Sequence, residues 1–206
     1  MFSKLQYISQ GKTAEEQLHN IQEALDAGCD WIQLRFKNAH PTELRSLAEK
    51  VKALCTEYEA TLIINDHPEI ARDIDADGVH VGLQDMPVGA VKEIVGDKII
   101  GGTANTLENV LQRVAEGCSY IGLGPFRFTT TKEKLSPILG LEGFQKIMDK
   151  LAKRDIQTPV YAIGGILIDD IAAILQTGVY GVAVSGIITH HPEKMYLLQR
   201  LSELLV

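Results

Sequence analysis

One pattern, repeated three times, limits what this chain can fold into more than any other feature. Residues 25–34, 114–123 and 175–184 each show the end of an amphipathic helical pattern, then a glycine, then a short apolar run. Glycine commonly closes a helix in the left-handed conformation, so Gly28, Gly117 and Gly178 mark junctions between a helix and a strand. Weaker copies occupy residues 74–81 and 94–100. We therefore expect helices and strands to alternate along the chain.

This alternation predicts an α/β fold with a parallel sheet, in about eight βα units of roughly 26 residues each. Helical spacing is evident at 41–51 and 107–114, and short β-branched runs at 62–64, 79–81, 98–100 and 160–163. No linker divides residues 1–206, which predicts a single domain. Because no strand has the polar pattern of a sheet edge, we predict a closed (β/α)8 TIM barrel; a doubly wound open sheet is the alternative.

Composition excludes several classes of protein. The net charge is −7 without a basic stripe, so nucleic acid is not an expected partner. No apolar run reaches the ~18 residues of a membrane helix, and the first residues lack the order of a signal peptide, so we expect neither a membrane nor secretion. Three cysteines without CxxC spacing are typical of reduced thiols in a cytoplasmic protein.

In a barrel, ligands bind at the carboxyl ends of the strands. The second predicted strand, residues 31–37, places apolar side chains on one face and Gln33, Arg35 and Lys37 on the other. A structural ion pair would explain a single arginine. Two cations and an amide inside a barrel are costly to bury without an anion, so a ligand that carries phosphate is the better interpretation.

Two carboxylates follow the next two strands. Asp66 ends the sequence Ile-Ile-Asn-Asp, and Asp85 follows the strand at 79–81. Each has a structural explanation, since Asn-Asp commonly starts a turn and Asp85 precedes Met-Pro like a helix cap. As a pair on neighbouring strands beside cations, they predict a magnesium site, because Mg2+ prefers one or two carboxylates plus phosphate oxygens.

Three later loops have features of phosphate binding. Residues 122–132 contain a Gly-Pro turn, then Thr129, Thr130, Thr131 and Lys132. The seventh strand leads into Gly164 and Gly165, and the eighth is predicted at 181–187 with Ser185 and Gly186 near its end. Loops after the last two strands of a TIM barrel often bind phosphate through backbone N–H groups. Among the histidines, His80 is consistent with a satisfied core residue, whereas His190 and His191 are expected to be solvated.

Taken in order, these motifs resemble the thiamine phosphate synthase (thiamine-phosphate pyrophosphorylase) family. The matching segments are Gln-Leu-Arg-Phe-Lys at 33–37, Asn-Asp at 65–66, Gly-Val-His-Val-Gly at 78–82 with Asp85, Gly-Leu-Gly-Pro at 122–125 with the residues at 129–132, and Ala-Ile-Gly-Gly-Ile at 162–166. The resemblance covers nearly the whole chain. It implies a transferase that joins a hydroxymethylpyrimidine diphosphate to a hydroxyethylthiazole phosphate and releases pyrophosphate.

The resemblance also implies a role for each matching residue. Gln33 and Asn65 would hold the pyrimidine. The diphosphate would meet Arg35, Lys37, Thr103, Asn105 and Lys132, of which Arg35, Lys37 and Lys132 would act in catalysis. Asp66 and Asp85 would bind Mg2+, and the thiazole phosphate would meet Thr129, Thr131, Gly164, Gly165, Ser185 and Gly186.

Some positions depart from the family pattern. His67 stands where an arginine commonly follows Asn-Asp, and Thr103-Ala104-Asn105 replaces a Ser or Thr followed by a His. The alternatives are a thiazole tautomerase-like isomerase and a non-catalytic thiazole phosphate binder. Small molecules are the expected partners. The sequence leaves open the oligomeric state, a homo-oligomer included, and whether the thiazole carries a carboxyl group.

Overall fold

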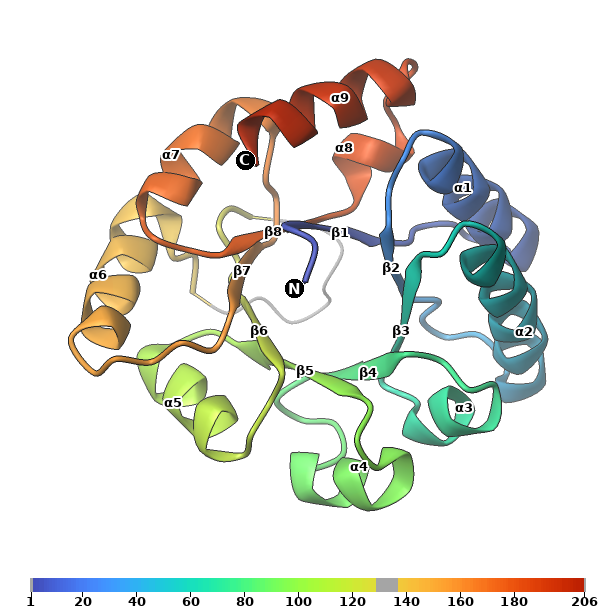
Figure 1. Cartoon of the computed structure of the whole chain (residues 1–206), viewed down its shortest axis with the longest axis horizontal. Coiled ribbons are helices and arrows are strands. Elements are labelled where there is room, and N and C mark those ends of the chain that lie inside the picture. The colour runs from blue at the N-terminus through green and yellow to red at the C-terminus, as the bar shows by residue number, and fades with distance from the viewer. Residues whose placement is uncertain (1, 129–136, 206) are drawn as a thin grey trace.

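Eight parallel strands hydrogen-bond in chain order, and the last strand pairs with the first (Figure 1). The computed structural model describes residues 2–128 and 137–205. The strands are β1 (Leu5–Ile8), β2 (Trp31–Leu34), β3 (Thr61–Asn65), β4 (Gly78–Val81), β5 (Ile99–Ala104), β6 (Tyr120–Leu123), β7 (Val160–Ile163) and β8 (Gly181–Val184). The predicted TIM barrel is confirmed, and the open sheet is wrong because β8 closes onto β1 in the register Leu5–Val182.

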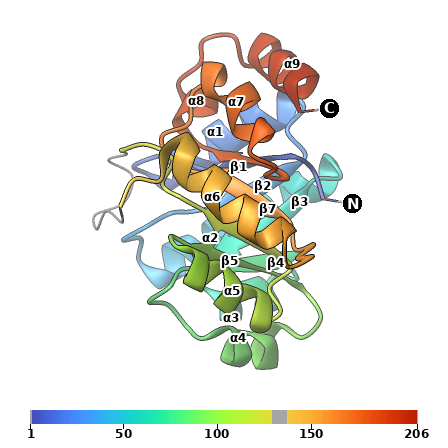
Figure 2. The same ribbon diagram turned by 90° about the vertical axis from the view of Figure 1, so that its left-hand side faces the viewer.

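Helices surround the barrel and follow the strands in turn (Figures 1 and 2). They are α1 (Ala14–Asp26), α2 (Pro41–Glu57), α3 (Pro68–Asp73), α4 (Val88–Val95), α5 (Leu107–Ala115), α6 (Gly140–Ala152), the 3-10 turn η1 (Ile168–Asp170), α7 (Ile171–Gln176), α8 (Gly186–Thr189) and α9 (Lys194–Leu204). Among the described residues, no helix is both long enough and apolar enough to cross a bilayer.

The glycines of the repeated pattern have the conformation expected of them. Gly28, Gly117 and Gly178 have φ values of 98°, 74° and 90°, in the left-handed region that other side chains rarely adopt. At the opposite helix ends, Thr13 and Thr106 accept backbone N–H groups of the first turn of α1 and α5. Local residue choice therefore starts and stops these helices.

Two apolar clusters fill the molecule. The larger lies between sheet and helices and includes Ile32 and Leu34, as the alternation in β2 predicts. The smaller fills the amino-terminal half of the barrel, where Trp31 packs between Phe2, Tyr120 and Tyr161 at ring-centroid distances of 5.1–5.2 Å. This aromatic floor blocks one end of the barrel. Ligands must therefore enter at the carboxyl ends of the strands.

Three strand boundaries differ from the sequence prediction. β2 ends at Leu34 because the N–H of Arg35 donates to the Ser9 hydroxyl at 2.9 Å instead of continuing the ladder. β8 ends at Val184, not 187, because the carbonyl of Ser185 accepts the N–H groups of Ile188 and Thr189 and starts α8. β5 extends to Ala104 through two glycines. A Cβ at Gly101 would lie 2.2 Å from the Tyr120 ring.

Candidate active site

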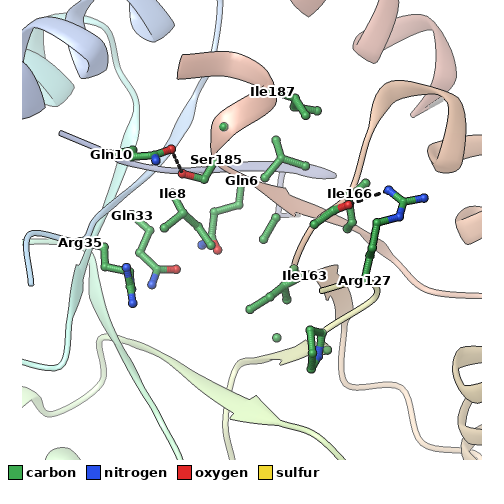
Figure 3. A pocket seen from close by; sticks show the side chains of 18 of the residues that line it. Gln6, Ile8, Gln10, Gln33, Arg35, Arg127, Ile163, Ile166, Ser185 and Ile187 are labelled. Atoms are coloured by element: carbon green, nitrogen blue, oxygen red, sulfur yellow. Dashed lines mark hydrogen bonds between the residues drawn. The ribbon is translucent and has the colours of Figure 1, made fainter. Parts of the chain in front are cut away.

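A cavity of about 590 Å3 opens at the carboxyl ends of the strands, and all eight strands or the loops that follow them contribute to its wall (Figure 3). Its lining residues are Gln6, Ile8, Gln10, Gln33, Arg35, Asn65, His80, Thr103, Asn105, Gly122, Gly124, Pro125, Arg127, Phe128, Ile163, Gly164, Gly165, Ile166, Leu167, Ala183, Val184, Ser185, Gly186, Ile187 and His190. Most of the residues selected from the sequence therefore share one cavity.

Two amides meet at the base of the β2–β3 side. Gln33 is buried, and its Nε2 donates to Asn65 Oδ1 at 2.8 Å. This bond uses the donor of one amide and the acceptor of the other. The Gln33 carbonyl remains as an acceptor and the Asn65 amino group as a donor. A heterocycle that carries both a donor and an acceptor can bond to this pair of groups.

Below these amides, a buried polar chain crosses the barrel. Gln6 Nε2 donates to the Tyr120 oxygen at 3.1 Å, which lies 3.1 Å from His80 Nδ1, and His80 Nε2 lies 3.0 Å from Thr103 Oγ1. Burial raises the pKa of the Tyr120 phenol, so it stays protonated. A neutral His80 that accepts at Nδ1 and donates at Nε2 satisfies this chain, and the prediction of a satisfied core histidine is confirmed.

Four charged side chains gather at the rim beside the amides. Lys37 Nζ lies 3.5 Å from Asp66 Oδ2. Burial raises the pKa of the Asp66 carboxyl, a hydrogen bond and the charge of Asp85 raise it further, and Lys37 and Arg35 oppose the rise. Burial lowers the pKa of the Arg35 guanidinium, and Asp66 opposes this effect. The structure thus brings together two cations and two carboxylates from three consecutive strand ends.

The two carboxylates have different backbone settings. Asp66 has a φ of +65°, which aspartate and asparagine adopt more readily than most residues. Asp85 does not cap a helix, because α4 begins after Pro87 without a side-chain cap. Its Oδ2 instead accepts the N–H of Gly82 at 2.7 Å, which fixes the turn after β4. The cap interpretation is therefore wrong.

On the opposite side, glycine-rich loops follow β7 and β8. Gly164 and Gly165 have φ values of 94° and 69°. A Cβ at Gly164 would lie 2.8 Å from Pro125, and one at Gly165 would lie 2.9 Å from the Phe128 carbonyl oxygen. Ser185 Oγ donates to Gln10 Oε1 at 3.3 Å (Figure 3), and Gly186 starts α8. At Gly164 and Gly165 the loop presents backbone at the cavity wall, because a side chain there would meet Pro125 or Phe128.

Some of the predicted site residues lie outside the cavity wall or outside the described residues. Lys37, Asp66 and Asp85 stand at the rim and outside the cavity wall. Asn105 lines the cavity, and its amide nitrogen donates to the Gly124 carbonyl. Thr129, Thr130, Thr131 and Lys132 lie outside the described residues.

Sequence reasoning did not assign five polar residues of the cavity wall to the site: Gln6, Gln10, His80, Arg127 and His190. His190 is exposed, as expected, but it belongs to the cavity rim. The rule that selected Gln33 also applies to Gln6, a polar residue within a short apolar strand. Arg127 carried no such signal, because its partners are 38 and 43 residues away in the sequence.

A family model described as thiamine monophosphate synthase matches residues 5–188. The chain belongs to the thiamine monophosphate synthase family. This confirms the resemblance seen in the motifs. A thiamine-phosphate synthase of Flavobacterium johnsoniae is 57% identical over 204 residues, covering 98% of this chain and 96% of the relative. One from Bacteroides fragilis is 48% identical and covers 96% of this chain and 97% of the relative.

A solved structure of the same family has the same fold. The thiamine phosphate pyrophosphorylase of Pyrococcus furiosus superposes with a TM-score of 0.86 at 32% identity, over 98% of this chain and 95% of that one.

Proposed function

We propose that this chain is a transferase that condenses 4-amino-2-methyl-5-hydroxymethylpyrimidine diphosphate with 4-methyl-5-(2-hydroxyethyl)thiazole phosphate, to give thiamine phosphate and pyrophosphate. The observation that carries the proposal is the two-sided cavity. Gln33, Asn65 and Arg35 line the β2–β3 side, with the other charged residues at the adjacent rim, and glycine-bearing loops line the β7–β8 side. A reaction that joins two phosphorylated substrates needs one phosphate site on each side of the bond that forms.

We assign the pyrimidine to the amide pair. The Gln33 carbonyl would accept from the exocyclic amino group, and the Asn65 amino group would donate to a ring nitrogen. Their mutual bond of 2.8 Å holds both side chains in the orientation that this requires. Thr103, fixed by His80 from below, would turn its hydroxyl proton toward the same substrate or its diphosphate.

We assign the diphosphate to the charged rim. Arg35 is partly buried beside Asp66 and lines the cavity, so a diphosphate bound on this side would bring negative charge to its guanidinium. Lys37 and Lys132 would add charge to the leaving group, and Asn105 would donate from the β5 loop. Charge that is already placed where the leaving group develops lowers the barrier without rearrangement.

A magnesium ion fits the same rim. Burial raises the pKa of Asp66, and the hydrogen bond and charge of Asp85 raise it further, so the charged form of this carboxyl is disfavoured in a way that a divalent cation would relieve. Asp66 and Asp85 would hold the ion, and bound Mg2+ supplies Lewis-acid neutralisation of diphosphate oxygens. Within the described residues no group of three His, Cys, Asp or Glu side chains forms a protein cage, which fits an ion that takes its other ligands from substrate and water.

We assign the thiazole phosphate to Gly164, Gly165, Ser185 and Gly186, together with Thr129 and Thr131. Backbone N–H groups would receive the phosphate, and glycine allows that backbone to approach the ligand. The apolar wall of Ile163, Ile166 and Ile187 would face the thiazole ring.

The chemistry needs no enzymatic nucleophile. The bond between the pyrimidine methylene carbon and the diphosphate oxygen breaks, its electron pair leaves with pyrophosphate, and the electron-rich pyrimidine stabilises the resulting cation. The thiazole nitrogen then donates its lone pair to that carbon. The chain's contribution is charge at the leaving group and orientation of the two rings.

The test is to mix the purified chain with both substrates and magnesium, and to measure pyrophosphate and thiamine phosphate in the same sample. We expect equal amounts of both, no product when either substrate is omitted, and none in excess EDTA. A tautomerase-like isomerase or a silent binder would release no pyrophosphate. A sample without pyrophosphate would therefore contradict the proposal.

We also propose a cytoplasmic location for this enzyme, in line with its three free, buried cysteines.

A further inference from the structure

Arg127 joins two loops that the reaction needs together. It follows β6, at the stem of the loop that leads to α6, and its side chain reaches the segment between β7 and α7 (Figure 3). Nη1 donates to the Gly165 carbonyl and to Asp170 Oδ2, and Nη2 donates to Asp170 Oδ1, all at 2.8 Å. One guanidinium therefore holds both ends of residues 165–170.

The backbone of the stem reinforces this contact. Phe126 N donates to the Ile163 carbonyl at 2.9 Å, and Arg127 N donates to the Gly164 carbonyl at 3.0 Å. The stem thus continues the pairing of β6 with β7 beyond the ends of both strands. Two successive carbonyls, of Gly164 and Gly165, point toward Arg127.

The direction of these two carbonyls also fixes the direction of the next N–H groups. In a trans peptide the carbonyl and the N–H point in opposite directions. The N–H groups of Gly165 and Ile166 are therefore turned away from Arg127. Both residues line the cavity, and Figure 3 shows Arg127 on the far side of it from Gln33 and Arg35.

The charge of the pair is stable. The guanidinium of Arg127 lowers the pKa of Asp170, and Asp170 raises the pKa of Arg127 in turn. Asp170 Oδ2 also accepts the N–H of Leu167 at 2.8 Å. The side chains of Arg127 and Asp170 are 44% and 17% exposed, and the two parallel hydrogen bonds of the pair fix the orientation of both groups. Its effect is expected to be on loop geometry.

We propose that Arg127 is a positioning residue for the thiazole phosphate. By holding the carbonyls of Gly164 and Gly165 toward itself, Arg127, fixed by Asp170, presets the opposite direction of the N–H groups of Gly165 and Ile166 for the phosphate. This inference rests on the proposed function for the identity of the ligand, but its physical content is anion affinity at this loop.

The experiment measures two substrates separately. We expect Arg127→Ala to raise the KM for thiazole phosphate by about tenfold, with the KM for the pyrimidine diphosphate within about twofold and kcat largely retained. Asp170→Asn, which is isosteric, should move the same KM in the same direction. The double variant Arg127→Ala/Asp170→Asn should be no worse than Arg127→Ala, because the two side chains act as one unit.

Arg45→Ala is the matched control. Arg45 pairs with Asp73 between α2 and α3, so this variant loses an arginine–aspartate pair outside the cavity wall. It should leave both KM values unchanged. If both KM values rise together in Arg127→Ala, or if only kcat falls, the role is structural and the inference is wrong.

Direct titration of thiazole phosphate separates this inference from the proposed function. A wild-type chain that binds the ligand but makes no product, with binding about tenfold weaker in Arg127→Ala, would contradict the function and support the positioning role. Equal affinity in the wild type and in Arg127→Ala, or no binding by the wild type, would overturn the positioning role.

Discussion

Asp66 combines the proposed role in metal binding with a setting that is costly for a charged carboxylate. Its positive φ suits only a few residue types, and its carboxylate is partly buried beside that of Asp85. Lys37 at 3.5 Å offsets part of the repulsion, but the pKa stays above its ordinary value. If Asp66 holds the proposed magnesium ion, binding of the cation would offset this cost.

Asp66→Asn should therefore stabilise the metal-free chain and abolish most turnover. A native pKa above the unfolded value means that the native state holds protons more tightly, so stability falls as pH rises above about 4. Asparagine removes this penalty and tolerates the positive φ. In EDTA, the unfolding midpoint of the variant should exceed that of the wild type at pH 7, and the difference should shrink toward pH 4. A lower midpoint at pH 7 would contradict this account.

Asp85 fixes the turn after β4 and, in the proposed function, also holds Mg2+; substitutions can separate these two roles. Asp85→Asn keeps an acceptor for the Gly82 N–H but removes the charge, whereas Asp85→Ala removes both. We expect both variants to lose roughly a hundredfold or more in turnover at saturating substrate, and only the alanine variant to lose stability. Steady-state kinetics and thermal unfolding measure the two effects. Full activity in Asp85→Asn would show that the residue acts only through its turn.

At the scale of strands and loops, the repeated pattern predicted element order better than element ends. The sequence pattern predicts β7 in full. It ends the fifth strand at Ile100, before Gly101, since glycine is a poor strand residue. The reason for that glycine is the Tyr120 ring, which comes from the next strand. The alternation of polar and apolar residues and the position after a strand were enough to select Gln33, Arg35 and Asp66 as site residues. The same signals could not select Arg127, since its contacts are with a loop distant in sequence.

The chain of Gln6, Tyr120 and His80 links β1, β6 and β4. Tyr120→Phe removes only the hydroxyl and leaves two buried groups without their partner. We expect the free energy of unfolding to fall by about 1–3 kcal/mol. Tyr196→Phe, which removes an exposed hydroxyl from α9, should change it by less than about 0.5 kcal/mol. Urea unfolding of both variants tests this; equal effects would show that the buried chain adds no stability.

For the whole molecule, the barrel has a closed aromatic end and an open polar end. Trp31, Tyr120 and Tyr161 fill the first, and the cavity occupies the second. Closure itself was predictable, because no strand has the polar pattern of a sheet edge. The sequence could not predict how the interior is divided into an aromatic end and a polar end. Inward-facing positions look alike in the sequence pattern, whether they carry aromatic rings near the strand starts or amides near the strand ends.

Burial of the cysteines sets an alkaline limit on the fold. It raises the pKa of Cys29 and Cys55 to about 12 and that of Cys118 to about 11. Unfolded thiols titrate near 9, so the unfolded state releases protons first. Stability then falls by roughly 1.4 kcal/mol per thiol per pH unit as pH rises from about 9 to the native pKa, which is about 11 for Cys118 and about 12 for Cys29 and Cys55.

At pH 8 the native chain should therefore resist a thiol reagent that labels all three cysteines in denaturant. Rapid labelling of the native chain would contradict the burial of these thiols.

The central claim is that one cavity holds a diphosphate with its cation on the β2–β4 side and a second phosphate on the β7–β8 side. The most direct test is a crystal structure of the chain with pyrophosphate, Mn2+ and thiazole phosphate, using the anomalous signal of manganese. We predict a peak between Asp66 and Asp85, pyrophosphate against Arg35, and the thiazole phosphate at Gly165. A metal peak away from both carboxylates, or both phosphates bound at the glycine loops, would contradict the account.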